Sequence, residues 1–545
     1  MGSIVDQTED SNAIHTDVLI IGAGFTGIVA IHRLRKQGFN VRCFEQGEGF
    51  GGVWYWNRYP GARVDSEWPF YQLDIPELIK SWTFSERFPG HEEIRRYFEH
   101  ADKVLNLSKD TFFNARVVEA TRDDDKNLWT IKTQQGHVAT AKYLILGTGL
   151  LHRSYMPDFP GLENYKGDLC HSADWLKDFN GRGKKIALIG AGATAVQITE
   201  QLGKVAEELV VFLRRPSYCL PMGQRKISAT EHDQLRPYIP ALMKASRESV
   251  SGFPTIPLSG SMLANPREVW EAELERLWSL GGFHANQATY RDIYVNPEAN
   301  ELHYQFWRKK VCQRLTDPEK QKIMAPEKKP YHIGTKRCPL EQDYYEVLNQ
   351  PNVKLHDLKA APLKEFTEKG IITSDGKEYE FDAVVLATGF DALTGSLTKL
   401  GLKNKDGIDL KDLWANGVSS YLGLAISGFP NAFMAYSPQA PNTLSNGTTI
   451  LQCQIDIIVD MINKLEGEEI KSIEPTPEAE REWKAAISEF ADRTLFPQTD
   501  SWWNGANIPG KKAEFSTFLP GIAVYERNCR DTFESWRGWK VVRNQ

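Results

Sequence analysis

The chain has 545 residues, of which 41% are hydrophobic and 25% charged, and its formal net charge at pH 7 is −6. This length is too great for a single hydrophobic core, so two or three domains are expected. The mixed charges exclude the basic surface of a nucleic-acid-binding protein, and no apolar run is long enough to span a membrane, so neither partner is expected.

The seven cysteines are scattered along the chain and never form a CxxC pair. This pattern favours a reducing compartment and argues against a zinc site or a redox disulfide. The polar start MGSIVDQTEDS differs from a signal peptide. We therefore expect a cytoplasmic protein without a metal site.

The first predicted unit is a buried strand that ends in a glycine-rich turn and continues as a helix. Gly22 permits the tight turn, Gly24 lets the backbone approach a pyrophosphate, and Gly27 lets the helix pack on the strand. A second strand, Val41–Phe44, is followed by Glu45, 21 residues after Gly24. A carboxylate at this place binds ribose hydroxyls and repels a 2′-phosphate, which favours FAD or NAD over NADP.

A glycine- and aromatic-rich loop, residues 51–65, follows this strand and is too long to be a simple connection. It contains Gly52, Trp54 and Asp65. Because it comes directly after the strand expected to bind the ribose, we expect it to line a site.

A hairpin, an apolar strand and an xTG turn occur twice in the same order. This weak internal repeat suggests two related nucleotide-binding units. The first copy comprises Leu128–Thr133, His137–Lys142, Tyr143–Leu146 and the turn 147–149, and the second Glu365–Thr373, Lys377–Phe381, Ala383–Leu386 and the turn 387–389.

A second dinucleotide fingerprint lies between these copies. Its strand, Ile186–Ile189, is followed by a turn containing Gly190, Gly192, Thr194 and Ala195. Arg214 follows Gly192 by 22 residues, and Arg215 is its neighbour. Guanidinium groups match phosphate oxygens, so this unit is predicted to bind NADPH.

Residues 223–329 depart from the alternation of strands and helices and are predicted to form a helical insertion. Asn265 is expected to cap a helix with Pro266 at its first position. The helix would bury an apolar stripe and end at a glycine pair. The stripe comprises Trp270, Leu274, Leu277 and Trp278, and the glycines are Gly281 and Gly282.

Two later segments carry candidate site residues. Lys336 and Arg337 precede a proline, and local sequence leaves open whether they form a solvated turn or point into a cleft. Residues 500–512 combine small residues, an amide and aromatic residues, including Trp502, and are typical of a lid loop.

The segment between the two fingerprints, with Tyr165, Gly167, His171 and Trp175, resembles the signature of type I Baeyer–Villiger monooxygenases. The loop of residues 51–65 is similar to the family's second signature. Tyr165 stands where phenylalanine is usual, and Leu176 where proline or aspartate is usual. The resemblance covers roughly residues 15–530.

The resemblance implies roles for several side chains. Arg337 matches the active-site arginine and Asp65 its carboxylate partner. Lys336 and Arg214 match contacts of the NADP 2′-phosphate, and Trp502 the lid tryptophan that contacts the nicotinamide ribose. His171 and Trp175 are similar to residues that act at the domain linker.

The resemblance also implies an α/β fold of two Rossmann-like domains with a helical insertion. Its activity would be oxidation of a ketone to an ester or lactone with NADPH and O2, through a C4a-peroxyflavin on FAD. A monomer is expected. The expected boundaries are 1–150 and 386–545 for the FAD domain, 151–222 and 330–385 for the NADP domain, and 223–329 for the insertion.

Three alternatives keep the two nucleotide sites. An N- or S-oxygenating flavin monooxygenase would use a protonated hydroperoxide, and a non-catalytic NADPH sensor would not consume NADPH. A pyridine-nucleotide disulfide reductase would need a redox cysteine pair, which the sequence lacks.

Overall fold

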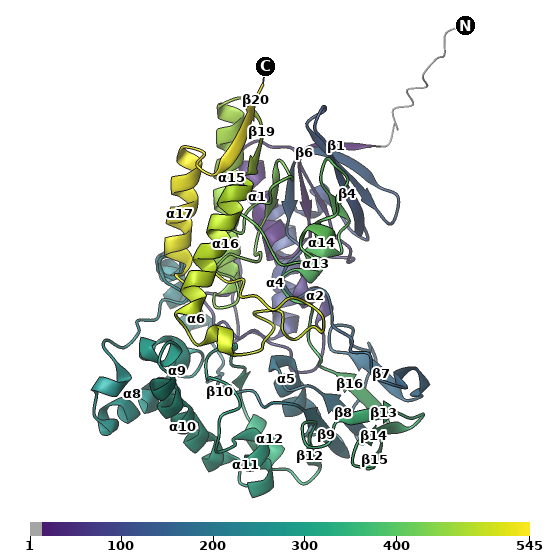
Figure 1. Cartoon of the computed structure of the whole chain (residues 1–545), viewed down its shortest axis with the longest axis vertical. Coiled ribbons are helices and arrows are strands. Elements are labelled where there is room, and N and C mark those ends of the chain that lie inside the picture. The colour runs from purple at the N-terminus through teal and green to yellow at the C-terminus, as the bar shows by residue number, and fades with distance from the viewer. Residues whose placement is uncertain (1–12, 545) are drawn as a thin grey trace.

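The computed structural model describes residues 13–544 and contains two parallel-cored sheets, which occupy the upper and lower halves of Figure 1. The upper sheet has the order β17-β4-β5-β6-β1-β2-β3, and β18 also pairs with β6. Its strands are β1 (Ile14–Ile21), β2 (Val41–Phe44), β3 (Thr111–Phe112), β4 (Val117–Asp123), β5 (Leu128–Thr133), β6 (Val138–Leu146), β17 (Leu402–Lys403) and β18 (Ala432–Met434).

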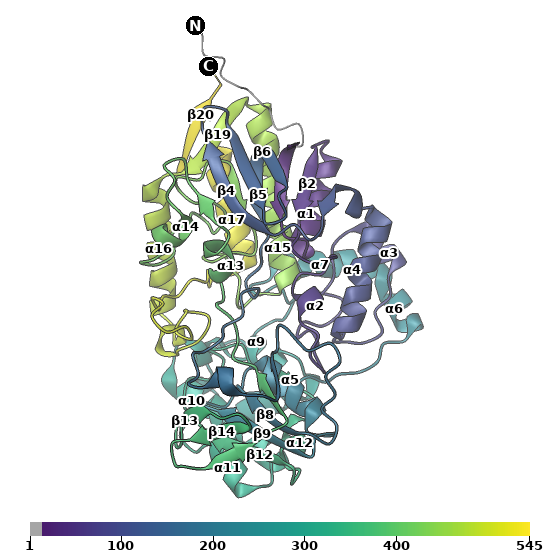
Figure 2. The ribbon, with the colours of Figure 1, turned by 90° about the vertical axis from the view of Figure 1, so that its right-hand side faces the viewer.

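Helices from both ends of the chain surround this sheet, with α1 and α15 packed against each other. Figure 2 shows α1 and α15 beside the sheet. The helices are α1 (Phe25–Lys36), α2 (Val53–Trp56), α3 (Pro76–Ser81), α4 (His91–Leu105), α13 (Gly395–Thr398), α14 (Leu410–Leu413), α15 (Gly447–Gly467), α16 (Pro477–Asp492) and α17 (Ile522–Glu534). The antiparallel pair β19 (Ile470–Pro475) and β20 (Trp539–Arg543) lies near the C-terminus.

The lower sheet is parallel, with the order β12-β9-β8-β16-β7. A three-stranded antiparallel sheet accompanies it. The elements of this half are β7 (Asp168–His171), β8 (Lys185–Ile189), α5 (Ala193–Leu202), β9 (Glu208–Leu213), α12 (Tyr344–Leu348), β12 (Val353–Asp357), β13 (Leu363–Phe366), β14 (Gly370–Thr373), β15 (Glu378–Glu380) and β16 (Ala383–Leu386).

The two halves repeat one packing arrangement. β6 pairs in parallel with β1, and β16 pairs in parallel with β8. A Cβ on Gly22 would lie 2.5 Å from the carbonyl oxygen of Gly147, and a Cβ on Gly190 would lie 2.3 Å from that of Ala387. Each fingerprint glycine therefore lets its turn pack against the turn after the neighbouring strand.

Helices dominate the region between β9 and β12, as the sequence predicts. They are α6 (Ala229–Leu235), α7 (Ile239–Glu248), α8 (Arg267–Leu280), α9 (His284–Gln287), α10 (Pro297–Arg314) and α11 (Pro318–Met324), and the short strands β10 (Leu220–Pro221) and β11 (Leu340–Glu341) frame them. The predicted stripe of α8 holds: Trp270, Leu274 and Leu277 are buried.

Two local predictions were wrong. Asn265 does not cap α8: its amide donates to the carbonyl of Ser261 and Pro266 is the cap residue. Residues 365–373 form β13 and β14 rather than one strand, because a turn with a hydrogen bond from Thr367 N–H to the carbonyl of Gly370 divides them. The helical and hydrophobic patterns alone do not reveal such local hydrogen bonds.

The α/β class with two Rossmann-like halves is confirmed, and the residue boundaries of the domains stay a prediction. No helix of the described residues 13–544 is both long enough and apolar enough to cross a bilayer.

Candidate active site

A cavity of about 1340 Å³ extends from the first glycine fingerprint to the second. It brings together most of the predicted cofactor residues from segments that are far apart in the chain. Its lining includes Gly22, Gly24, Glu45, Gly52, Trp54, Asp65, Gly190, Gly192, Thr194, Arg214, Arg215, Lys336, Arg337 and Trp502. Gly27 and Ala195 lie outside this lining and are buried where α1 and α5 pack on their strands.

Glu45 lies at the end of β2, directly beside the first fingerprint. Its two carboxylate oxygens accept hydrogen bonds from the N–H groups of Ala23 at 2.7 Å and Gly47 at 2.8 Å. Burial raises the pKa of Glu45, while these N–H groups favour its ionised form. The carboxylate is thus held at the cavity wall, where ribose hydroxyls are expected.

The aromatic loop of residues 51–65 closes over the first fingerprint and reaches the second half. Gly52 packs against Gly24, and the indole N–H of Trp54 donates to the hydroxyl of Tyr71 at 2.8 Å. The hydroxyl of Tyr59 donates to Oε1 of Gln197 on α5 at 2.9 Å. The loop therefore connects the two nucleotide-binding halves.

Three basic side chains gather at the second fingerprint. Arg214 is exposed, Arg215 pairs with Asp500 at 3.2 Å, and the Lys336 ammonium lies 4.4 Å from the centre of the Tyr331 ring. Burial, together with the charge of Arg215, lowers the pKa of Lys336 to about 8. A phosphate dianion at this place would favour the charged lysine, so the cluster fits a 2′-phosphorylated ribose.

Arg337 points into the cavity rather than into a solvated turn. Its Nε and Nη2 atoms donate to the two oxygens of Asp65 at 2.5 and 2.8 Å, and Nη1 donates to the carbonyl of Thr443 at 3.2 Å. The guanidinium carbon lies 4.8 Å from the centre of the Phe283 ring. Burial opposes the charged form of Arg337, but Asp65 outweighs it and the pKa is raised.

The predicted lid, residues 500–512, crosses the middle of the molecule between the two halves (Figure 1). Trp502 lines the cavity and packs against the cluster of Leu150, Ala392 and Leu393. The Asn507 amide donates to the carbonyl of Phe390 at 2.9 Å, and Lys511 pairs with Asp391 at 2.6 Å. These contacts hold the loop on the xTG turn after β16.

The signature residues between the fingerprints lie where the chain passes from β6 of the upper sheet to β7 of the lower sheet. Gly167 precedes β7, and the ring of His171 at its end stands edge-on to that of Phe390, 6.0 Å away. Trp175 packs edge-on against Phe179 at 5.2 Å. His171 and Trp175 are absent from the cavity lining, which supports a structural role at the linker.

Both departures from the signature have a physical account. The hydroxyl of Tyr165 donates to the carbonyl of Phe381 at 2.9 Å, so the extra oxygen is satisfied. Leu176 is 38% exposed and lies where side-chain identity has little packing consequence.

The donor set fits two dinucleotides. A Cβ built on Gly192 would meet no atom within 4 Å, so the second turn leaves open space where a pyrophosphate approaches the backbone. At the first site, the hydroxyl of Ser445 is buried, has no hydrogen-bond partner among the described residues and lines the cavity. A ligand there would satisfy it.

Comparisons with known proteins agree with this geometry. Residues 16–252 match the family described as pyridine nucleotide-disulphide oxidoreductase. The chain is 41% identical over 531 residues to the FAD-binding monooxygenase acrE of Aspergillus aculeatus, covering 97% of this chain and 90% of that protein. It is 40% identical over 523 residues to cyclopentanone 1,2-monooxygenase of Comamonas sp., covering 95% and 94%. A Baeyer–Villiger monooxygenase of Pseudooceanicola batsensis is 36% identical over 526 residues, with 95% of each chain covered. The chain belongs to the Baeyer–Villiger monooxygenase family.

Solved structures of similar proteins contain the cofactors that the motifs predict. Cyclohexanone monooxygenase of Rhodococcus sp. Phi1 bound to NADP+ superposes with a TM-score of 0.94 at 34% identity, covering 98% of this chain and 100% of that one. OTEMO in complex with FAD and NADP superposes with a TM-score of 0.93 at 33% identity, covering 97% and 100%. The protein is therefore an FAD- and NADP-dependent Baeyer–Villiger monooxygenase that oxidises ketones to esters or lactones, as its motifs predicted.

One relative carries a different name: phenazine N-monooxygenase PhzNO1 of Lysobacter antibioticus is 34% identical over 531 residues, covering 96% of this chain and 97% of that protein. The match to the disulphide oxidoreductase profile reflects the shared two-nucleotide fold, because all seven cysteines of this Baeyer–Villiger monooxygenase are free.

The sequence alone did not reveal several contacts of the site. Tyr59 with Gln197, and Thr443 with Arg337, join segments more than 100 residues apart. Tyr59 lies within the loop of residues 51–65, which the sequence predicts to line a site, but no local pattern identifies its partner. Thr443 contributes a backbone carbonyl, which has no sequence signal.

Proposed function

We propose that this Baeyer–Villiger monooxygenase uses NADPH and O2 to oxidise a ketone beside the Asp65–Arg337 pair. The observation that carries this assignment is the two-pronged hydrogen bond of Arg337 to Asp65 at the wall of the cavity that joins both fingerprints. FAD, when bound, passes electrons from NADPH to O2 and supplies the oxygen that attacks the carbonyl.

Arg337 places a permanent positive charge where negative charge develops on oxygen during the attack. Its raised pKa means that it keeps its proton at neutral pH and stabilises an oxyanion without protonating it. Asp65 accepts two hydrogen bonds from it and fixes the plane of the guanidinium. Trp502 and the lid would exclude water from the same space.

We further propose that Arg214, Arg215 and Lys336 bind the 2′-phosphate of NADPH and that Glu45 binds the ribose of FAD. The support is that all four side chains line one cavity, with the basic side chains at the second fingerprint and the buried carboxylate at the first. Opposite charges at equivalent places would direct each nucleotide to its own site.

Arg337→Ala tests the central role. The variant should bind FAD and accept electrons from NADPH, yet lose about 10²–10³-fold in kcat for ketone oxygenation, because the charge that stabilises the oxyanion is gone. Stopped-flow spectroscopy would follow flavin reduction, and mass spectrometry would identify ester products. The control is Arg58→Ala, which changes an exposed arginine on the same loop as Asp65. Wild-type ester formation by Arg337→Ala would refute the assignment.

The runner-up activity is N-oxygenation, favoured by the similarity to phenazine N-monooxygenase. An amine nitrogen is itself a nucleophile and gains nothing from an oxyanion-stabilising guanidinium, so Arg337 argues for the ketone. A panel of cyclic ketones and N-heteroaromatic compounds, each assayed for oxygenated products, separates the two. Products from the heteroaromatic panel alone would select the alternative.

We also infer a monomer in the cytoplasm. The seven unpaired thiols support a reducing compartment. Size-exclusion chromatography with light scattering tests the assembly.

A further inference from the structure

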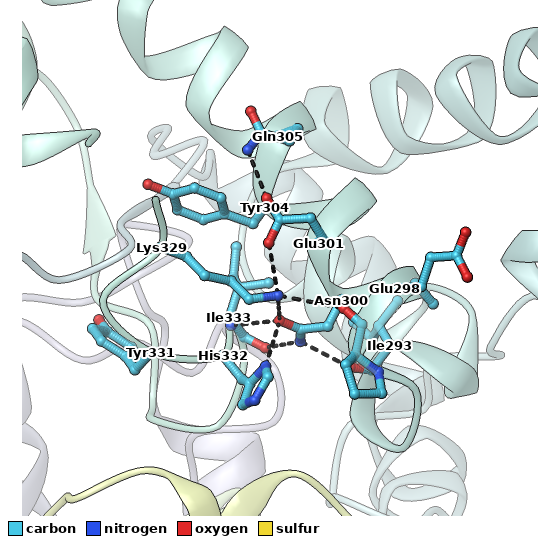
Figure 3. Close-up of polar contacts among 12 residues, drawn as sticks. Ile293, Glu298, Asn300, Glu301, Tyr304, Gln305, Lys329, Tyr331, His332 and Ile333 are labelled. Carbon is cyan, nitrogen blue, oxygen red and sulfur yellow. Dashed lines mark hydrogen bonds and ion pairs between the residues drawn. The ribbon is translucent and has the colours of Figure 1, made fainter. Parts of the chain in front are cut away.

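Asn300 on α10 is completely buried and uses its whole side chain in hydrogen bonds (Figure 3). Its amide nitrogen donates to the carbonyls of Ile293 at 2.8 Å and Ile333 at 2.9 Å. Its oxygen accepts from the N–H of Ile333 at 3.2 Å. Asn300 thus pairs with both backbone groups of Ile333, as a neighbouring strand would, and fixes this segment four residues before Arg337.

Two further side chains converge on the same oxygen. Nζ of Lys329 lies 3.2 Å and Nδ1 of His332 lies 3.3 Å from Oδ1 of Asn300. Lys329 also pairs with Glu301 at 3.0 Å. Because the amide nitrogen of Asn300 is committed to two carbonyls, its oxygen can only face these donors. The orientation of Asn300 is therefore determined from both sides.

Residues 332–335 contact Gln498 and Thr499, which directly precede the lid and are called the lid root here. Nε2 of His332 lies 3.1 Å from Oε1 of Gln498, and the hydroxyls of Thr335 and Thr499 lie 2.7 Å apart. Thr335 and Thr499 are each 1% exposed, so water does not compete for their bond.

These contacts join the segment that precedes Lys336 and Arg337 to the segment that precedes the lid. Lys336 and Arg337 follow Thr335 directly, whereas Asp500 and Trp502 follow Thr499. None of Asn300, Thr335 and Thr499 lines the cavity, so a direct contact with a nucleotide or ketone does not explain their buried polar groups.

We propose that Asn300, His332 and Thr335 are positioning residues that couple the lid to the segment carrying Lys336 and Arg337. NADP+ held by the basic cluster would thereby order the lid, and a closed lid would hold Arg337 in place. This coupling rests on the proposed role of Lys336 at the 2′-phosphate.

The test measures NADP+ affinity and hydrogen exchange of residues 500–512 in the FAD-loaded enzyme, with and without NADP+. In the wild type, NADP+ should slow exchange in the lid. Thr335→Val removes the hydroxyl at nearly constant volume and should abolish this protection and raise the Kd for NADP+ about tenfold, with FAD binding unchanged. Asn300→Asp, which keeps the acceptor and loses both donors, should act in the same direction.

Gln305→Leu is the matched control. Gln305 is exposed on α10, bonds Glu301 at 2.7 Å, and contacts neither Ile333 nor the lid root. Its lid protection and NADP+ affinity should equal those of the wild type. Wild-type protection and affinity in Thr335→Val, or the same loss in Gln305→Leu, would overturn the proposal.

Thr499→Val keeps the test decisive if Asn300→Asp fails to fold. The Thr335 hydroxyl also donates to the carbonyl of His332 at 2.6 Å, so Thr335→Val loses one bond more than Thr499→Val. When the two hydroxyls act as one pair, Thr335→Val with Thr499→Val should be no worse than Thr335→Val alone. Independent, additive losses would contradict the coupling. Arg337→Ala separates this proposal from the proposed function. Wild-type ester formation by that variant would refute the catalytic role of Arg337, whereas the proposed coupling is judged by the hydrogen exchange of the lid in the Thr335 and Thr499 variants.

Discussion

At the scale of single residues, Lys336 shows how the surroundings adjust a charged group to its ligand. Burial and the charge of Arg215 lower its pKa to about 8, so in the free enzyme the ammonium loses its proton just above neutral pH. The 2′-phosphate needs the charged form. The KM for NADPH should therefore stay nearly level below pH 7, rise about twofold between pH 7 and 8, and rise about fivefold between pH 8 and 9, since the charged fraction falls by these factors.

Steady-state assays from pH 6.5 to 9.5 with NADPH and NADH would check this prediction. NADH lacks the phosphate, so its KM should not show the rise. Lys336→Arg should remove the inflection, because a guanidinium keeps its charge over this range. A rise of the same size with NADH would assign the pH dependence to another group. Arg214→Ala should raise the KM for NADPH far more than for NADH.

At the scale of elements, α5 carries a buried carboxyl group, Glu200, whose pKa is raised to about 7 by burial and by the nearby charge of Glu341. The unfolded chain loses this proton near pH 4.5, so the free energy of unfolding falls as the pH rises from 4.5 to 7. Above pH 7 this destabilisation stays constant. Glu200→Gln keeps an acceptor for the N–H of Gln342 and should stabilise the fold by ~2 kcal/mol at pH 8 and by little at pH 4.5.

Thermal unfolding at the two pH values checks this prediction. Glu346→Gln is an informative control, because Arg314 lowers the pKa of Glu346 and its ionised form stabilises the fold. That change should lower the melting temperature at pH 8, although modestly, since the side chain is half exposed. Equal effects of Glu200→Gln at both pH values would exclude a buried ionisation.

At the scale of the whole molecule, ion pairs attach the helical insertion to the FAD half. Arg247 on α7 donates to both oxygens of Glu526 on α17 at 2.8 Å and to Asp456 on α15 at 2.5 Å, and Arg33 on α1 also pairs with Asp456. Figure 2 shows α7 beside these helices. The arginine and its partners are about three-quarters buried, so the network resists screening.

Arg247→Met should leave Asp456 with only Arg33 and Glu526 with only Arg530 as partners. It should cost ~1–3 kcal/mol of stability, less than breaking a fully buried pair, because water reaches the site and each carboxylate keeps one arginine. Thermal unfolding and limited proteolysis around α7 would report the loss. Arg267→Met, which changes an exposed pair within α8, should have almost no effect. An unchanged melting temperature in Arg247→Met would show that apolar packing alone holds the insertion.

Local patterns in the sequence determined the two nucleotide-binding units of this protein. A buried strand, a glycine turn, a helix and a charged residue about 20 positions later lie within one short segment, so chain connectivity alone brings them together. The opposite charges of Glu45 and Arg214 could be assigned for the same reason. Gly281 and the apolar stripe of α8 were likewise readable, since helix periodicity and termination are local properties.

Only the tertiary structure decided where Lys336 and Arg337 point, because the carboxylate that orients Arg337 is 272 residues away in the chain. The same holds for Asn300, whose partners are backbone groups, and for the Thr335–Thr499 pair that ties the active-site segment to the lid. Composition and hydrophobic periodicity predict which side chains are buried. Which buried polar groups meet depends on how distant segments pack, and that is settled only when the whole chain has folded.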